Sequence, residues 1–310
     1  MTLQCTDTVF LVRPAAFGFN AETAATNRLQ RGNAAPEPQT QRRALAEFDA
    51  MVAALRSEGI NVCVVDDTPQ PAKPDAVFPN NWVSWHDDGT VVLYPMQAVN
   101  RRAERREDIV TAVAEATGFR IARVLDLTRH ERDGRFLEGT GSLVLDRVAR
   151  VAYACRSPRT DARVLGEWCE AMGYESELFD ATDRAGVPLY HTNVLMGIGD
   201  TFAAIGVECV APADRVRVLE RLASGGRTVI ELDREEIEAF AGNLLELATW
   251  DEALGDSSVL VLSATARAAL APGRFAQFAA CTDTVLSVPL PTIEQAGGGS
   301  VRCMLAEVFR

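Results

Sequence analysis

The stretch GGGSVRCMLAEVF, residues 297–309, stands almost at the end of a 310-residue chain and decides the fold that we predict. Chain termini usually fray and carry little chemistry. Here three glycines precede an alternating apolar pattern at Val301, Cys303 and Leu305, which predicts a strand drawn into a sheet. Glycines at such a place let backbone or ligand approach closely.

The preceding sequence repeats one pattern. Helix patterns with an apolar stripe and a terminal glycine occupy 40–59, 104–118, 160–173 and 213–226. In the third of these, Thr160 is the predicted N-cap. Short strand patterns occupy 61–67, 119–127, 174–180, 227–233 and 282–290. Hairpin patterns at 82–96 and 141–155 complete an order of strand, strand, helix, strand, which recurs about five times without a linker.

A distinctive segment follows each of the five strand patterns. These segments are PDAVFPNNW (74–82), RFLEGTGSLV (135–144), LYHTNVLM (189–196), FAGNLLEL (240–247) and GGSVRCML (298–305). Their marker residues are Asn81, Glu138, His191, Asn243 and Cys303, at intervals of 52 to 60 residues. Single units of this size cannot bury a core, so we expect them to close side by side around an axis. The marker residues would then meet at the centre, and the last strand would pair with the first, at 9–14.

Composition limits the classes of protein. The net charge of −12 argues against nucleic acid or an anionic membrane surface as a partner. No apolar run reaches the ~18–20 residues of a membrane-spanning helix, and the N-terminus has no signal-peptide pattern. The odd number of cysteines, 7, is typical of reduced thiols. We therefore expect a cytoplasmic protein with a small-molecule substrate, and its oligomeric state stays open.

Cysteine, histidine and carboxylate in matching repeat positions indicate an activated thiol nucleophile. Cys303 would attack an electrophilic carbon, and His191 would shuttle protons. Glu138 would either orient the imidazole or bind the substrate. Each residue taken singly is also typical of a core or turn position. A zinc site is disfavoured because the sequence has no CxxC, HxxE or HxH pair, and its glycine segments are too short to bind a phosphate cofactor.

Several motifs resemble the guanidine-modifying, or pentein, superfamily. They are PDAVFPNNWVSWH, YPMQAVNRRAERRE, FLEGTGSLVLD, YHTNV, GGGSVRCM and the initial VFLVRPAAFGFNAETAATN. They are most similar to the citrulline-utilisation hydrolase group of amidinotransferase-like proteins. The resemblance implies a single α/β domain over 1–310, a five-bladed propeller of ββαβ units. It also implies covalent catalysis by Cys303 with His191 and Glu138, without metal or cofactor.

The resemblance also suggests a substrate. Members that act on guanidinium compounds clamp the group with two aspartates, and the matching positions here are Asn81, with Asn80 beside it, and Asn193. A guanidinium prefers ionised acceptors, whereas an amide side chain offers a donor and an acceptor to a neutral ureido group. These differences favour citrulline. Asp75 remains as a carboxylate that binds either a guanidinium or the substrate's α-amino group.

Further residues complete the predicted site. Either Arg101 or Arg102 would pair with a substrate carboxylate, while Arg105 and Arg106 are equally typical of a solvated helix start. Phe78 belongs to the same predicted substrate site. Asn243 is a candidate on repeat phase alone.

The predicted reaction is hydrolysis of citrulline to ornithine, ammonia and carbon dioxide through a covalent cysteine intermediate. The alternatives are an arginine dihydrolase or an arginine deiminase-like activity. An alternative of another class is a binding module with the same fold and no catalysis.

Overall fold

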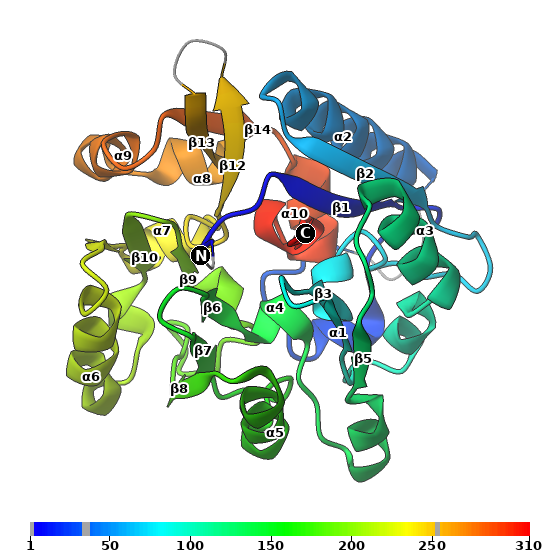
Figure 1. Cartoon of the computed structure of the whole chain (residues 1–310), viewed down its shortest axis with the longest axis horizontal. Helices are drawn as coiled ribbons and strands as arrows, with labels where there is room; N and C mark the ends of the chain where they lie inside the picture. Colours follow the sequence, from blue (N-terminus) through cyan, green and yellow to red (C-terminus); the bar gives the residue numbers. More distant parts are fainter. Residues whose placement is uncertain (1–2, 33–37, 252–254) are drawn as a thin grey trace.

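In the computed structural model, five sheets of three strands are arranged around a common centre, with helices on the periphery (Figure 1). The structure describes residues 3–32, 38–251 and 255–310. In the second to fifth sheets an antiparallel hairpin is followed by a helix and then by a third strand parallel to the hairpin's second strand. The predicted α/β fold of repeated ββαβ units is thereby confirmed.

The elements of each unit follow the chain. The first sheet contains β15 (Ala306–Glu307), β1 (Thr8–Arg13) and β2 (Asn61–Asp66), with α2 (Pro38–Ser57) before β2. The second contains β3 (Val83–Trp85), β4 (Thr90–Leu93) and β5 (Arg123–Asp126), with α3 (Glu107–Thr117). The third contains β6 (Val144–Asp146), β7 (Val151–Cys155) and β8 (Glu175–Phe179), with α5 (Ala162–Met172).

The last two units follow the same plan. The fourth contains β9 (Met196–Ile198), β10 (Phe202–Ile205) and β11 (Thr228–Glu231), with α6 (Pro212–Ala223). The fifth contains β12 (Leu245–Asp251), β13 (Gly255–Ser263) and β14 (Thr284–Val288), with α8 (Ala264–Ala269) and α9 (Pro272–Ala279). Three short helices lie outside this plan: α1 (Ala21–Ala24), α7 (Arg234–Glu238) and α10 (Pro291–Gly297).

The two ends of the chain meet in one sheet. β15 pairs antiparallel with β1, with Val9 opposite Glu307, as the sequence predicted. The predicted strand over 301–305 is wrong, because α11 (Val301–Met304) is a single helical turn. All four residues of this turn are buried, so its apolar pattern cannot distinguish a turn from a strand.

The outer helices bury the stripes that their sequences predict. In α5 the buried residues are Val164, Leu165, Trp168, Cys169 and Met172. The N-cap of α5 is Asp161 and not Thr160, because the Asp161 carboxylate accepts hydrogen bonds from two backbone N–H groups of the first turn. Each apolar stripe packs on the sheet of its unit and so fixes the orientation of the inner segments.

A short turn precedes the first strand of each unit, and these turns carry the marker residues. They include η1 (Pro79–Asn81), α4 (Gly139–Ser142), η4 (Thr192–Val194) and α11. α4 contacts both η1 and η4, and α11 contacts η1. Asn243 links the remaining gap, since its side chain bonds the backbone of Asn193 on one side and of Arg302 on the other. The turns thus form a continuous ring of contacts at the centre.

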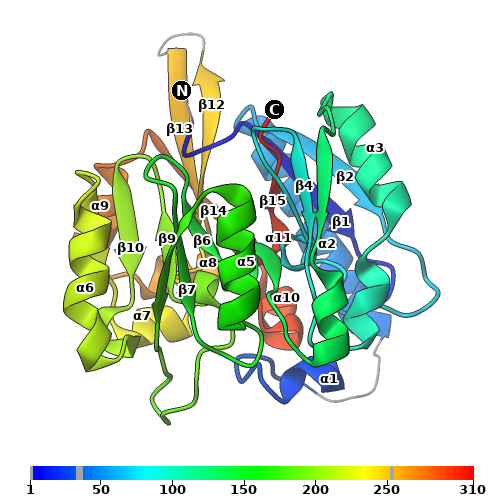
Figure 2. The ribbon, with the colours of Figure 1, turned by 60° about the horizontal axis from the view of Figure 1, so that its bottom comes forward.

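The two ends of this ring differ. Figure 2 shows α1 and α10 at one end, and both chain termini at the other. The short segment before β1 crosses the second end, where Gln4 donates to the backbone of Leu145 and Ile198. None of the described helices is long and apolar enough to cross a membrane.

Candidate active site

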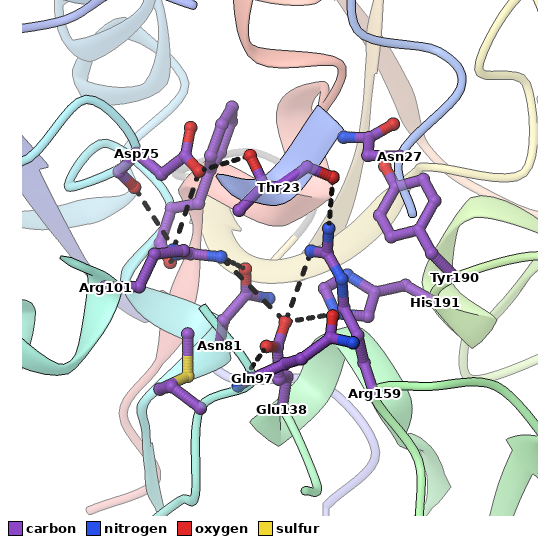
Figure 3. Close-up of polar contacts among 12 residues, drawn as sticks. Thr23, Asn27, Asp75, Asn81, Gln97, Arg101, Glu138, Arg159, Tyr190 and His191 are labelled. Atoms are coloured by element: carbon purple, nitrogen blue, oxygen red, sulfur yellow. Dashed lines mark hydrogen bonds and ion pairs between the residues drawn. The ribbon is translucent and has the colours of Figure 1, made fainter. Parts of the chain in front are cut away.

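The inner turns enclose a cavity of about 250 Å³, counted as space free of atoms. It lies beneath α1 and the glycine run, and Figure 3 shows the polar side chains that converge there. The lining residues are Thr23, Asn27, Asp75, Phe78, Asn81, Arg101, Arg159, Tyr190, His191, Gly297, Gly298, Gly299 and Cys303. The structure therefore brings His191 and Cys303, 112 positions apart in the printed sequence, to one cavity.

Glu138 and His191 form a buried pair. The Nε2 atom of His191 lies 2.8 Å from Oε2 of Glu138, and the carboxylate also accepts the backbone N–H of Gln97 at 3.0 Å. Glu138 is fully buried and His191 is 2% exposed. With Nε2 held by the carboxylate, Nδ1 is the nitrogen left to exchange protons. Of the two roles left open by the sequence, the geometry gives Glu138 that of orienting the imidazole.

The charges around this pair decide its protonation. Burial by itself raises the pKa of Glu138, but the charge of Arg159 and the hydrogen bond from His191 outweigh it and hold the pKa below its ordinary value. Burial lowers the pKa of His191 to about 4, although Glu138 opposes that shift. At neutral pH the pair is therefore a carboxylate and a neutral imidazole that can accept a proton.

Cys303 has two amide side chains at its sulfur. The Nδ2 atoms of Asn193 and Asn243 lie 3.4 and 3.3 Å from Sγ. The thiol is 3% exposed and lines the cavity. The sequence placed both asparagines in the substrate site, whereas the structure places them against the sulfur.

Arg101 is held by its own neighbours. Its guanidinium bonds Glu104 through Nε and Nη2, each at 2.9 Å, and Nη1 bonds Oδ1 of Asn81 at 2.8 Å. Arg102 is turned away from the cavity: its Nε donates to the backbone of Met96 and pairs with Glu131 at 3.3 Å. Of the two arginines predicted to bind a carboxylate, only Arg101 therefore reaches the cavity.

Asp75 presents an unused acceptor. Its Oδ2 accepts hydrogen bonds from Asn20 at 2.8 Å and Thr23 at 3.0 Å, while its buried Oδ1 has no hydrogen-bond partner among the described residues. Arg101 approaches Oδ2 only to 3.8 Å. A buried carboxylate oxygen without a donor is suited to bind an N–H group of a ligand.

The glycine run is explained by close packing. A Cβ on Gly297 or Gly299 would lie 2.8 or 3.0 Å from the ring of Phe78. Gly298 has φ +63°, and a Cβ there would lie 2.5 Å from the backbone N of Gln30. The expectation of close backbone approach at these glycines is confirmed. Phe78 thus lines the cavity and at the same time presses on the segment that leads to Cys303.

Sequence reasoning missed several lining residues. Arg159 is the most important: it is 2% exposed, and its Nη1 lies 3.4 Å from Glu138. Its other nitrogens bond Thr26 Oγ1 and the backbone of Thr23. Thr23, Asn27 and Tyr190 were also missed. Arg159 lies in a loop between β7 and α5, outside the repeat phase, so only the initial family-like segment and the position before Asp161 offered any signal.

Among the described residues, no group of three or more histidine, cysteine or acidic side chains is placed to hold a metal ion.

Comparison with known proteins places the chain in a family. Residues 13–310 match the family model described as N,N dimethylarginine dimethylhydrolase, eukaryotic. The chain belongs to this family. It is accordingly a pentein-superfamily hydrolase that acts on C–N bonds with a cysteine nucleophile, as predicted, and the non-catalytic binding module is set aside. The matching model is named for dimethylarginine, whereas the sequence motifs indicated citrulline.

Solved structures share the fold. The N-terminal domain of ArgZ, an arginine dihydrolase from the ornithine–ammonia cycle in cyanobacteria, has a TM-score of 0.73 at 19% identity, over 98% of this chain and 99% of its own. Unliganded AgrE has a TM-score of 0.74 at 19% identity, over 97% of this chain and 39% of its own.

A dimethylarginine dimethylaminohydrolase with an S-methyl-L-thiocitrulline adduct has a TM-score of 0.65 at 16% identity, over 98–99% of both chains, with 99% of this one covered. No protein with a curated description matches the chain.

Proposed function

We propose that this hydrolase cleaves the C–N bond of a ureido amino acid, with citrulline as the best-fitting substrate and Cys303 as the nucleophile. The observation that carries the proposal is the state of Asn81. Its Oδ1 accepts from Arg101 at 2.8 Å, and its Nδ2 donates to Asn80 at 2.9 Å. Because a guanidinium can only donate, the amide oxygen must face Arg101.

This arrangement discriminates between the two substrate classes. With its oxygen engaged, Asn81 has only a second N–H left to offer to the cavity. A substrate guanidinium has donors alone and carries a positive charge, so it would meet an N–H and the nearby Arg101. The carbonyl oxygen of a ureido group can accept that N–H. The amide groups of Asn81 and Asn193 therefore support a neutral ureido substrate.

The amino-acid end of the substrate has separate partners. The free Oδ1 of Asp75 suits the α-ammonium group. Arg159 suits the carboxylate, because its nitrogens bond the neutral oxygens of Thr23 and Thr26, which a carboxylate can replace. Arg101 is less suited to that role, since Glu104 already occupies it bidentately.

The reaction balances with these groups. The Cys303 thiolate adds to the ureido carbon, and the C–N bond to the ornithine nitrogen breaks. The proton that left the thiol passes through Nδ1 of His191 to the departing amine. Water then attacks the S-carbamoyl carbon, gives one proton to His191, and releases carbamate and the thiol. Carbamate decomposes to ammonia and carbon dioxide. Glu138 stabilises the imidazolium that forms twice.

A guanidino substrate is the second candidate. The family model is named for dimethylarginine, and ArgZ is described as an arginine dihydrolase. The free carboxylate oxygen of Asp75 is the feature of this site that favours such a cation.

The test is to incubate the purified protein with citrulline, arginine or N,N-dimethylarginine, and to quantify ornithine, citrulline, ammonia and dimethylamine. Ornithine and ammonia from citrulline, and neither from Cys303→Ala, is the expected result. Asn81→Asp restores an anion beside Arg101 and should shift the ratio of kcat/KM toward arginine by about tenfold or more. A wild-type protein that releases dimethylamine or converts arginine faster than citrulline would overturn the proposed substrate.

A further inference from the structure

The sulfur of Cys303 lies among donors that the sequence assigned to the substrate. Asn193 and Asn243 are both fully buried, and their Nδ2 atoms lie 3.4 and 3.3 Å from Sγ. Sulfur hydrogen bonds are longer than those to oxygen, so these separations are bonding distances. The asparagines come from neighbouring inner turns and reach the sulfur from two units of the ring.

The orientation of the Asn243 amide is fixed by the backbone. Its Oδ1 accepts the N–H of Arg302 at 3.0 Å, which obliges Nδ2 to lie on the opposite side. One Nδ2 hydrogen then goes to the backbone oxygen of Asn193 at 2.9 Å, and the other points at Sγ. Since Arg302 precedes Cys303, the same amide fixes both the turn and the sulfur that it carries.

Asn193 can serve both protonation states of the sulfur. Its Oδ1 lies 3.7 Å from Sγ, within range of a proton donated by the thiol. After that proton leaves, Nδ2 is the group that donates to the thiolate. His191 is bound at Nε2 by Glu138 and is neutral in the free site, so the imidazole brings no positive charge to the sulfur.

We propose that Asn193 and Asn243 are catalytic residues that bind the Cys303 sulfur and stabilise it as a thiolate, rather than residues that bind the substrate. The inference rests on the proposed function only in taking Cys303 as the nucleophile. The two amides supply hydrogen bonds to an anion in a buried site, where such bonds are strong. They do for the thiolate what an oxyanion hole does for a developing charge on oxygen.

The experiment measures the thiolate without any substrate. The rate of alkylation of Cys303 by iodoacetamide is followed across pH by mass spectrometry, which separates it from the other cysteines. Asn243→Asp keeps an oxygen for the N–H of Arg302 and replaces the N–H donor with a carboxylate. We expect its alkylation at neutral pH to fall at least about tenfold, and its pH midpoint to rise by about one unit or more.

Two comparisons make the result specific. Asn80→Asp introduces the same charge in the same ring, at a residue whose side chain bonds Asn81 and not the sulfur, and it should change the midpoint much less. Asn193→Ser removes the other donor without adding charge, and it should slow alkylation by several-fold. It also decides the matter if Asn243→Asp does not fold.

The proposal is overturned if folded Asn243→Asp or Asn193→Ser alkylates with the wild-type pH profile, or if Asn80→Asp moves the midpoint as far as Asn243→Asp does. Failure of the citrulline assay with a shifted alkylation profile would refute the proposed substrate and leave this inference supported. Cys155 is an internal reference in every sample, because burial raises the pKa of this thiol to about 11 and should keep it slow.

Discussion

Glu138→Gln is the substitution that most directly tests how the site works. It keeps the size and one oxygen acceptor of the side chain, so the bond from the backbone of Gln97 can persist. It removes the negative charge 2.8 Å from Nε2 of His191. In the proposed reaction His191 becomes an imidazolium when it carries the proton to the leaving amine. The loss should therefore be felt mainly in the transition state.

The magnitude follows from the geometry. Two unit charges about 4 Å apart, a reasonable separation of charge centres for this contact, interact by about 4 kcal/mol at an effective dielectric of about 20. The remaining amide acceptor retains about 1 kcal/mol as a neutral hydrogen bond. The net loss of about 3 kcal/mol corresponds to a decrease in kcat of about 10²-fold.

The assay is ornithine release from citrulline, with kcat and KM determined separately and folding checked by circular dichroism. We expect kcat to fall by about that factor and KM to change little, because Glu138 is not proposed to touch the substrate's ureido group or its amino-acid end. A folded variant with kcat within threefold of wild type would refute the role given to this carboxylate. A large rise in KM with unchanged kcat would instead indicate that Glu138 binds substrate.

Two more expectations concern stability. Because burial lowers the pKa of His191 from 6.5 to about 4, the unfolded chain binds the proton more readily between these values; stability is complete above pH 6.5 and declines by about 3 kcal/mol as the pH falls to 4. Urea unfolding of His191→Gln should show a weaker decline over that range, and an unchanged slope would contradict the burial argument. Gly298→Ala and Gly118→Ala both require positive φ, +63° and +72°, but only at 298 would the new Cβ meet other atoms. Gly298→Ala should therefore lower the free energy of unfolding by about 1–2 kcal/mol more than Gly118→Ala does, and equal losses would show that backbone strain alone is at work.

The repeat gave the sequence its predictive power. Amphipathic stripes such as that of α5 and short apolar strands are local patterns, so they identified the units before any coordinates. Because one unit repeats, Glu138, His191 and Cys303 could be expected at equivalent places on inner turns. The same local view failed for 301–305. A turn buried on every side carries no periodicity that separates it from a strand.

The sequence by itself determined the repeated unit, the joining of the two chain ends, and the residue types that meet at the centre. Only the tertiary structure decided what each of them touches. Arg159 reaches Glu138 from a loop outside the repeat, Glu104 occupies Arg101, and Asn243 faces sulfur. The physical reason is that backbone patterns are set by near neighbours along the chain. Hydrogen-bond partners in the ring are set by the packing of units more than fifty residues apart in sequence.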